Sequence, residues 1–371
     1  MDLYTLELTN YWLPIIWVCA AGLILNMFPK KNELVNGHVR ERWFWLIAIA
    51  LVIPLVIWAG ARTRLGDTGA YRIIFNNAPS SFWELPSYLK IHTKDQGFVV
   101  LMTTLKSLGI KKARDFFMLI AALQMFCMVF AFRKYSPNYW VCIFLFVAST
   151  DYFSWMFNGM RQFIAATVIF AAFHLLVNGH FLWYCLVVLV VSRIHGSALL
   201  MIPLAYVMQG KAMNRKIQLL IVVTVLLLPF ADRFMPLLTN ILEETQYNDV
   251  TNNELWANDD GTNILRVLVY SMPAIISLFG WRYIANSNDR VMNMCINGAL
   301  ITMVLYLVSM VTSGVYIGRL PIYTTFQGYI ALPWVLEQIF DKRSRNLILL
   351  LLVLCYAVFY YYQLGIGWGL L

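Results

Sequence analysis

Arginine residues near the ends of long apolar stretches are the residues of this 371-residue sequence best suited to chemistry. A guanidinium group stays charged at any working pH and donates two parallel hydrogen bonds to phosphate oxygens. Charged side chains near membrane depth are costly, so their presence there indicates a function. The pattern therefore predicts binding of an anionic phosphate or diphosphate. The candidate ligands of this anion are Arg62, Arg64, Arg161, Arg193, Arg266 and Arg319.

Other polar residues accompany these arginines in the sequence. Asp67 follows Arg62, Asn158 and Gln162 flank Arg161, and His195 lies between two apolar stretches. Each residue also has a structural alternative. An arginine at a helix end often extends to the lipid headgroups, and a single histidine is more often packed and hydrogen-bonded than catalytic.

The composition predicts an all-α, polytopic membrane protein that holds these residues at the ends of its helices. Hydrophobic residues make up 60% of the chain and charged residues 13%, with a mean hydropathy of +0.66. A soluble domain carries roughly 25% charged residues. A crossing takes about 20 residues, so one integral membrane domain over residues 1–371 would hold about 12 spans, within a range of roughly 10 to 13. The apolar stretches are 11–28, 43–61, 115–132, 139–157, 161–177, 181–194, 197–209, 217–231, 264–284, 291–312, 320–340 and 346–363.

Short basic loops predict the orientation of these spans. Lys and Arg collect on the cytoplasmic side of membrane proteins, and this rule, rather than nucleic-acid binding, explains the net charge of +9. The basic clusters that we place inside are at residues 30–42, 133–134, 211–216 and 342–345. The termini and the loops 62–96 and 232–263 then lie outside, and residues 97–110 form a re-entrant or interfacial helix there.

The candidate site residues fall at the predicted outer ends of the spans. The outer face should be poor in arginine, so their collection there favours one shared, outward-facing cavity. The stretches 181–194 and 197–209 are short for full crossings. They form either two short helices or one helix that is broken around His195-Gly196.

Sequence motifs for nucleotides, metals and acyl chemistry are absent. The chain has no G-x-x-x-x-G-K-[ST], no H-E-x-x-H, no D-x-D and no G-x-S-x-G. These absences argue against a nucleotide-driven pump, a metal-held sugar nucleotide and a serine acyltransferase. The six cysteines lie in apolar stretches without a C-x-x-C pair, unlike a zinc site or a disulfide framework. We therefore expect neither a metal nor another cofactor.

Five short patterns occur in an order that resembles the EpsG/Wzy family of polysaccharide repeat-unit polymerases, over about residues 60 to 330. The patterns are Arg62-x-x-x-Gly66-Asp67-Thr68-x-x-Tyr71, Asp95-Gln96-Gly97-Phe98, Asn158-Gly159-Met160-Arg161-Gln162 followed by Ile164-Ala165, His195-Gly196-Ser197, and Gly318-Arg319 with Tyr323. One departure concerns the second pattern, where the family segment is Glu-Pro-Gly. The resemblance therefore assigns no role to Asp95.

The resemblance implies a glycosyltransferase built as a helical bundle similar to the GT-C fold. It would move a growing glycan from undecaprenyl diphosphate to a sugar hydroxyl of another lipid-linked repeat unit, on the outer face of the bacterial cytoplasmic membrane. The arginines would stabilise the departing diphosphate without a metal, and His195 or Asp67 would accept the hydroxyl proton. The further substrate contacts that the resemblance implies are Asn158, Gln162, Tyr71 and Tyr323.

The same resemblance implies the partners of the chain. These are the undecaprenyl-diphosphate-linked repeat units and membrane lipids, with a chain-length regulator and a flippase of the same pathway.

The chemistry of the implied reaction also predicts its stereochemical outcome. A single displacement at the anomeric carbon of the donor sugar would invert the configuration of that carbon.

Two other functions remain open from the sequence. A flippase for the same lipid-linked glycan would also need many spans and arginines, but it should expose cationic groups to a cavity reachable from both faces. An O-antigen ligase shares the donor and differs only in its acceptor, so the residues alone do not separate it from a polymerase.

Overall fold

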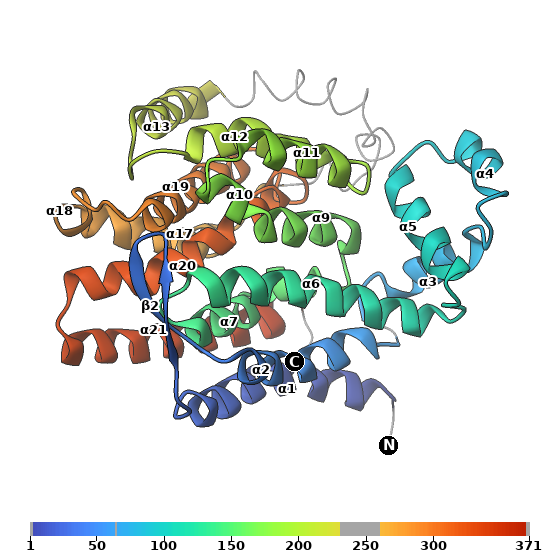
Figure 1. Ribbon diagram of the computed structural model, residues 1–371, viewed down its shortest axis with the longest axis horizontal. Helices are drawn as coiled ribbons and strands as arrows, with labels where there is room; N and C mark the ends of the chain where they lie inside the picture. The colour runs from blue at the N-terminus through green and yellow to red at the C-terminus, as the bar shows by residue number, and fades with distance from the viewer. Residues whose placement is uncertain (1–2, 64, 231–259, 369–371) are drawn as a thin grey trace. The chain divides into compact units, whose positions relative to one another are not determined.

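The computed structural model describes residues 3–63, 65–230 and 260–368, and this part of the chain is mostly helical (Figure 1). Helices occupy all of the predicted apolar stretches as far as they are described, which confirms the all-α class. The chain divides into two compact units, which are described separately. The first unit comprises Met1–Leu199 with Phe340–Leu371, and the second comprises Leu200–Ile339.

Four helical segments in the described residues are long and apolar enough to cross a membrane. They are Ala113–Tyr135, Met160–Val177, Arg290–Met310 and Lys342–Gly367. Shorter apolar helical segments of 10–17 residues are Tyr11–Leu25, Trp45–Gly60, Tyr139–Ala148, Phe181–Ser192, Gly196–Met208 and Ile264–Phe279. A multi-pass membrane protein is therefore supported, whereas the total of about twelve crossings and the GT-C-like arrangement remain predictions.

The first unit is organised around one long helix, α6. Its helices are α1 (Leu3–Leu25), α2 (Trp45–Gly60), α3 (Thr68–Asn77), α4 (Leu85–Ile91), α5 (Gln96–Ser107), α6 (Ala113–Tyr135), α7 (Tyr139–Ala148), α8 (Thr150–Ser154), α9 (Met160–Ala171), α10 (Phe173–Val177), α11 (Phe181–Ser192) and α21 (Lys342–Tyr362), which continues as a π-helix (Gln363–Gly367). Helix α6 packs against α2, α3, α7 and α9. Its buried residues recur at helical spacing, as in Phe117, Ala121, Gln124 and Met128, so one continuous face of α6 lies in the core.

A two-stranded antiparallel hairpin, which we did not predict, joins α1 to α2. Strand β1 (Lys31–Val35) pairs with β2 (His38–Arg42). The turn residues Asn36 and Gly37 both have positive φ angles, of 49° and 83°, as a two-residue hairpin turn of type I′ requires. The pattern Asn-Gly was therefore the available sequence signal for this hairpin.

The hairpin covers the C-terminal end of α6, where backbone carbonyls lack partners within the helix. Arg40 Nη1 donates to the carbonyl of Tyr135 at 3.0 Å, and Arg42 Nη2 donates to the carbonyl of Lys134 at 2.7 Å. Glu33 pairs with both Arg42 and Arg133. Two of the predicted inner basic clusters therefore meet at one end of the first unit.

The opposite end of α6 is surrounded by the segment that we predicted as the outer loop 62–96. That segment is not a plain loop, because it contains α3 and α4. Helix α5 lies where we predicted a re-entrant or interfacial helix, 97–110, and its position at the membrane stays a prediction. Helices α3 and α5 extend from the end of the first unit where α6 begins (cyan in Figure 1). An apolar cluster holds them there. The rings of Phe75 and Phe116 are stacked with their centres 4.7 Å apart, and those of Tyr71 and Phe98 meet edge to face at 6.0 Å.

Helical structure is interrupted around His195-Gly196, where the sequence predicted either a broken helix or two short helices. Helix α11 ends at Ser192, and a 3₁₀ helix begins at Gly196, so His195 lies in the non-helical segment between them. The second predicted outer loop, 232–263, lies mostly outside the described residues.

The second unit packs α17, α19 and α20 against one another. Its helical segments are α12 (Met201–Met208), α13 (Arg215–Leu227) with a 3₁₀ turn (Leu228–Phe230), α17 (Ile264–Phe279), α18 (Trp281–Ile284), α19 (Arg290–Met310), a 3₁₀ turn (Ile317–Arg319) and α20 (Ile322–Ile339). A Cβ at Gly298 would lie 2.8 Å from the Cβ of Gln327, so glycine permits the close approach of α19 and α20. The Asn297 side chain donates to the carbonyls of Met208 and Lys211 and accepts from the Met213 N–H, which fixes the turn between α12 and α13.

The predicted orientation can be tested with two single cysteines at opposite ends of α6. Ser80 lies between α3 and α4, and Val39 is exposed on the hairpin. Because the basic clusters should lie inside, Ser80→Cys should react with a membrane-impermeant maleimide added to intact cells. Val39→Cys should react only after the membrane is made permeable. The parent chain measures the background of the native cysteines, and the reverse labelling pattern would contradict the orientation.

Candidate functional site

Most of the predicted site residues of the first unit lie at the end where α6 begins. This end is formed by the segment after α2, the starts of α3 and α5, the turn before α9 and the segment after α11. Residues far apart in the sequence therefore become neighbours through three contacts.

The first contact joins the start of α3 to the turn before α9. The backbone N–H of Asp67 donates to Asn158 Oδ1 at 3.2 Å. Gly66 has a φ of 50°, and a Cβ on it would lie 1.5 Å from the same oxygen. Glycine is therefore required here both for its backbone conformation and for the close approach. Asn158 holds the Asp67 backbone through this contact, while the Asp67 residue itself is exposed.

The second contact is an ion pair between Arg161, at the start of α9, and Asp95, which precedes α5. Arg161 Nη1 donates to Asp95 Oδ2; the Asp95 side chain is 8% exposed and that of Arg161 is 36% exposed. Burial raises the pKa of the Asp95 carboxyl, and the positive charges of Arg161 and Lys94 oppose this shift. Asp95, to which the sequence assigned no role, is therefore the residue that orients Arg161.

Tyr71 of α3 belongs to the same group. Burial raises the pKa of its hydroxyl, and Arg161, which interacts with the hydroxyl through its charge and a hydrogen bond, opposes the shift. The nearby Asp67 carboxylate adds to the increase. Arg161 thus lies between a carboxylate and a phenol hydroxyl, and its position is set from two sides.

The third contact joins the start of α5 to the segment after α11. The Gly97 N–H donates to the carbonyl of Arg193 at 2.7 Å, and a Cβ on Gly97 would lie 2.6 Å from the Arg193 carbonyl carbon. This bond satisfies one of the free N–H groups at the start of α5. It places His195, two residues further along, beside the segment that carries Asp95. His195 is half-buried, and Arg193 is exposed.

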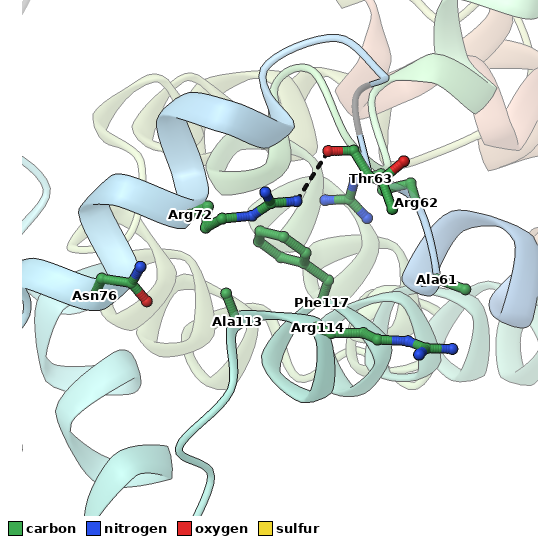
Figure 2. Close-up of a pocket in the computed structure, with 8 residues that line it drawn as sticks. All are labelled: Ala61, Arg62, Thr63, Arg72, Asn76, Ala113, Arg114 and Phe117. Carbon is green, nitrogen blue, oxygen red and sulfur yellow. Dashed lines mark hydrogen bonds between the residues drawn. The ribbon is translucent and has the colours of Figure 1, made fainter. Parts of the chain in front are cut away.

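A separate pocket of about 550 Å³ lies beside this group, between the end of α2, helix α3 and the start of α6 (Figure 2). It is lined by Ala61, Arg62, Thr63, Arg72, Asn76, Ala113, Arg114 and Phe117. Of these residues the sequence pointed only to Arg62. The arginines Arg72 and Arg114 were missed, because nothing in their local sequence indicates that they share a pocket.

Arg62 is held firmly in the wall of this pocket. It is 6% exposed. Its Nε donates to Thr68 Oγ1 at 3.0 Å, and its guanidinium carbon lies 4.5 Å from the centre of the Phe117 ring. Burial lowers the pKa of the Arg62 guanidinium to about 10, so the group remains charged at neutral pH.

The remaining predicted residues have other positions. Gln162 is buried in α9, and Arg64 lies outside the described residues. Arg266, Arg319 and Tyr323 belong to the second unit. There, Ser309 Oγ donates to Thr262 Oγ1 at 2.8 Å and the Thr262 N–H donates to the carbonyl of Ser309. These bonds bring the start of α17, with Arg266, to the end of α19 from which the chain continues to Arg319.

Within the described residues, no group of three or more His, Cys, Asp or Glu side chains is placed to hold a metal ion. The positively charged groups described at this end of the first unit include several arginines, which suit an anionic ligand.

A comparison with models of protein families shows to which family the chain belongs. The model of the EpsG family matches residues 44–365. The chain belongs to the EpsG family. The match includes all five short patterns and all predicted site residues in both units, so the resemblance seen in the sequence is confirmed. Family membership makes this a membrane protein of the polysaccharide-polymerase type. No curated protein and no solved structure matches the chain.

The contact between α3 and the turn before α9 can be tested with two glycines three residues apart. Gly66→Ala should lower the free energy of unfolding by about 1–2 kcal/mol, since the left-handed conformation is strained for any residue with a Cβ and Asn158 must also move. Gly69→Ala is the matched control, because its Cβ would meet nothing within 4 Å. Thermal unfolding of both variants in detergent gives the comparison. Equal melting temperatures would show that the Gly66 contact does not hold the site.

Proposed function

We propose that the chain is a polysaccharide polymerase, a glycosyltransferase that acts on the outer face of the bacterial cytoplasmic membrane. It moves a growing glycan from undecaprenyl diphosphate to a sugar hydroxyl of another lipid-linked repeat unit. The observation that carries this proposal is the grouping of Arg161, Asp95, Tyr71 and His195 at one end of the first unit. This end is opposite the hairpin, where two of the basic clusters that we predicted to lie inside meet.

The proposed reaction is a single displacement. The acceptor hydroxyl oxygen forms a bond to the anomeric carbon of the donor sugar, and the bond from that carbon to the diphosphate oxygen breaks. The hydroxyl proton passes to a base, for which His195 and Asp67 are the candidates. Undecaprenyl diphosphate leaves with the bonding electron pair, and the configuration at the anomeric carbon inverts.

Arginines can stabilise the negative charge of the leaving diphosphate. Negative charge builds up on the diphosphate as the bond breaks, and donors fixed in advance stabilise that charge. Arg161 is fixed in this way by Asp95 and Tyr71, at the start of α9, where the helix dipole adds positive potential. The sequence predicts diphosphate binding also by Arg62, Arg64, Arg193, Arg266 and Arg319, of which Arg62 lines the separate pocket. Asn158, Gln162, Tyr71 and Tyr323 complete the proposed substrate contacts.

Purified protein incubated with lipid-linked repeat units tests the function as a whole. A polymerase produces a ladder of products that differ by one repeat unit. A flippase leaves the substrate covalently unchanged, and an O-antigen ligase consumes it only when its separate acceptor is added. Either of these last two results would contradict the proposal.

Substitution of Arg161 by lysine separates the proposed binding of diphosphate from the structural ion pair with Asp95. In Arg161→Lys the positive charge can still pair with Asp95, so the fold should be kept. The planar guanidinium fork is lost, however, and with it the paired hydrogen bonds to phosphate. We expect normal expression and a melting temperature close to that of the parent, with little or no polymer. Arg215→Lys, at an exposed position in a predicted inner cluster, is the control and should form polymer normally. Polymer from Arg161→Lys at the parent level would remove Arg161 from the diphosphate site.

The base can be tested with two histidines at the two ends of α11. His195→Ala should abolish polymer formation while binding of the lipid-linked donor is retained, because a base acts in the reaction rather than in binding. His180→Ala, at the residue that precedes α11, should leave polymer formation unchanged. Unchanged polymer in His195→Ala would make Asp67 the base, and Asp67→Asn would then be the inactive variant.

A further inference from the structure

The pocket beside the proposed reaction site has an unusual charge. Three of its eight lining residues, Arg62, Arg72 and Arg114, are arginines, and none is acidic. Within the described residues, none of these arginines forms an ion pair with a carboxylate. Figure 2 shows Arg72 extending from α3 towards the segment that carries Arg62, where it donates to the carbonyl of Thr63 at 2.9 Å, and Arg114 on the α6 side.

Arg62, which lines this pocket, has an unused hydrogen-bond donor. Although the residue is buried, its Nη2 atom has no hydrogen-bond partner among the described residues. A buried charged group without its full set of hydrogen bonds is costly. An anion in the pocket would lower this cost, because its charge would neutralise the guanidinium.

The shape and composition of the pocket restrict the ligand. Its volume of about 550 Å³ lies within the range of roughly 300–1,000 Å³ of small-molecule sites. Ala113, the first residue of the long helix α6, also lines it, so the positive end of the helix dipole lies at its edge. Several guanidinium donors around one space suit a ligand with several charged oxygens, as in a diphosphate.

The lining also separates this pocket from a reaction centre. It contains no histidine, carboxylate, tyrosine or cysteine that could accept a proton, and Arg161 and His195 are not part of it. The pocket can bind an anion but supplies no base. In the proposed reaction both donor and acceptor carry a lipid diphosphate, so a polymerase must hold two such groups at once.

We propose that Arg62, Arg72 and Arg114 form an anchoring site for the diphosphate of a lipid-linked substrate, separate from the reaction site around Arg161. The chemistry of the ligand, a diphosphate, follows from the pocket. Its source, a lipid-linked glycan, rests on the proposed function.

Binding by the full-length protein in phosphatidylcholine nanodiscs tests the site without any need for polymer formation. The probes are inorganic diphosphate and undecaprenyl diphosphate, and the readouts are the dissociation constant and the ligand-induced rise in melting temperature. Arg72→Gln and Arg114→Gln should each weaken binding roughly tenfold or more, the loss expected for one charged hydrogen-bonding group. Both residues are exposed, so the folded state should survive either change, and if one variant unfolds the other decides.

Lys111→Gln is the matched control, because it removes one exposed positive charge near the start of α6 from a residue that does not line the pocket. It should bind both probes like the parent. Parent-like affinity in Arg72→Gln and Arg114→Gln would overturn the anchoring site, whether or not the chain makes polymer. Weakened binding in those variants, together with a parent that forms no ladder, would keep the site and reject the polymerase.

A further arm distinguishes the source of the phosphate. Phosphatidylglycerol replaces part of the phosphatidylcholine, at the mole fraction used for undecaprenyl diphosphate. Retained binding of undecaprenyl diphosphate supports the proposal. Its displacement by phosphatidylglycerol would show an ordinary headgroup site and overturn the assignment to a diphosphate.

Discussion

A helix that crosses a bilayer satisfies its own backbone hydrogen bonds everywhere except at its two ends, and charged groups are tolerated there more readily than in the lipid core. The two ends of α6 show how this constraint organises the first unit. At the C-terminal end, Arg40 and Arg42 of the hairpin satisfy the last carbonyls. At the N-terminal end, α3 and α5 pack around the helix start and leave a pocket lined by arginines. The functional groups collect at the ends because the middle of the unit cannot hold them.

Arginine serves two different purposes at these two ends, and the neighbouring acids separate them. At the hairpin, Glu33 lies between Arg42 and Arg133. Burial raises the pKa of the Glu33 carboxyl, but the charges and hydrogen bonds of the two arginines outweigh this effect and lower the pKa. These arginines pair with Glu33 inside the protein, and the ion pairs connect the hairpin to α6. In the pocket at the other end, Arg62, Arg72 and Arg114 have no such acid among the described residues. Their charge remains available to a ligand.

The sequence predicted the helices well because each follows from a long apolar stretch, for which the bilayer leaves no other structure. It also placed Arg62, Arg161 and His195 at the ends of helices, whereas the one cavity that it predicted for them stays a prediction, because Arg62 lines a pocket to which Arg161 and His195 do not belong. The hairpin was missed because its residues are mostly polar and were assigned to a loop, although Asn36-Gly37 indicated the turn. Helices α3 and α4 were missed because their amphipathic pattern was overlooked within a charged segment.

Pairings between distant segments could not be predicted in the same way. Arg161 and Asp95 are 66 residues apart in the sequence, and only the folded chain shows that Asp95 reaches Arg161. Arg72 and Arg114 likewise belong to α3 and α6, and each alone resembles an ordinary surface arginine. Spacing along the sequence predicts which residues share a helix face, but the packing of α3 and α5 on α6 determines which helix faces meet.

The Asp95–Arg161 pair has a consequence for turnover under the proposed function. A polymerase must release undecaprenyl diphosphate after each transfer, and a cluster of arginines without acids would bind that product as firmly as the transition state. Only an interaction that is stronger in the transition state than in the bound states speeds the reaction. Under this proposal the Asp95 carboxylate would compete with the fully charged product diphosphate for Arg161, and it would thereby favour release of the product. An acid thus lies beside Arg161, and none lies beside Arg62, Arg72 and Arg114 among the described residues. This difference fits a reaction site that must release its product and an anchoring site that must keep its substrate bound.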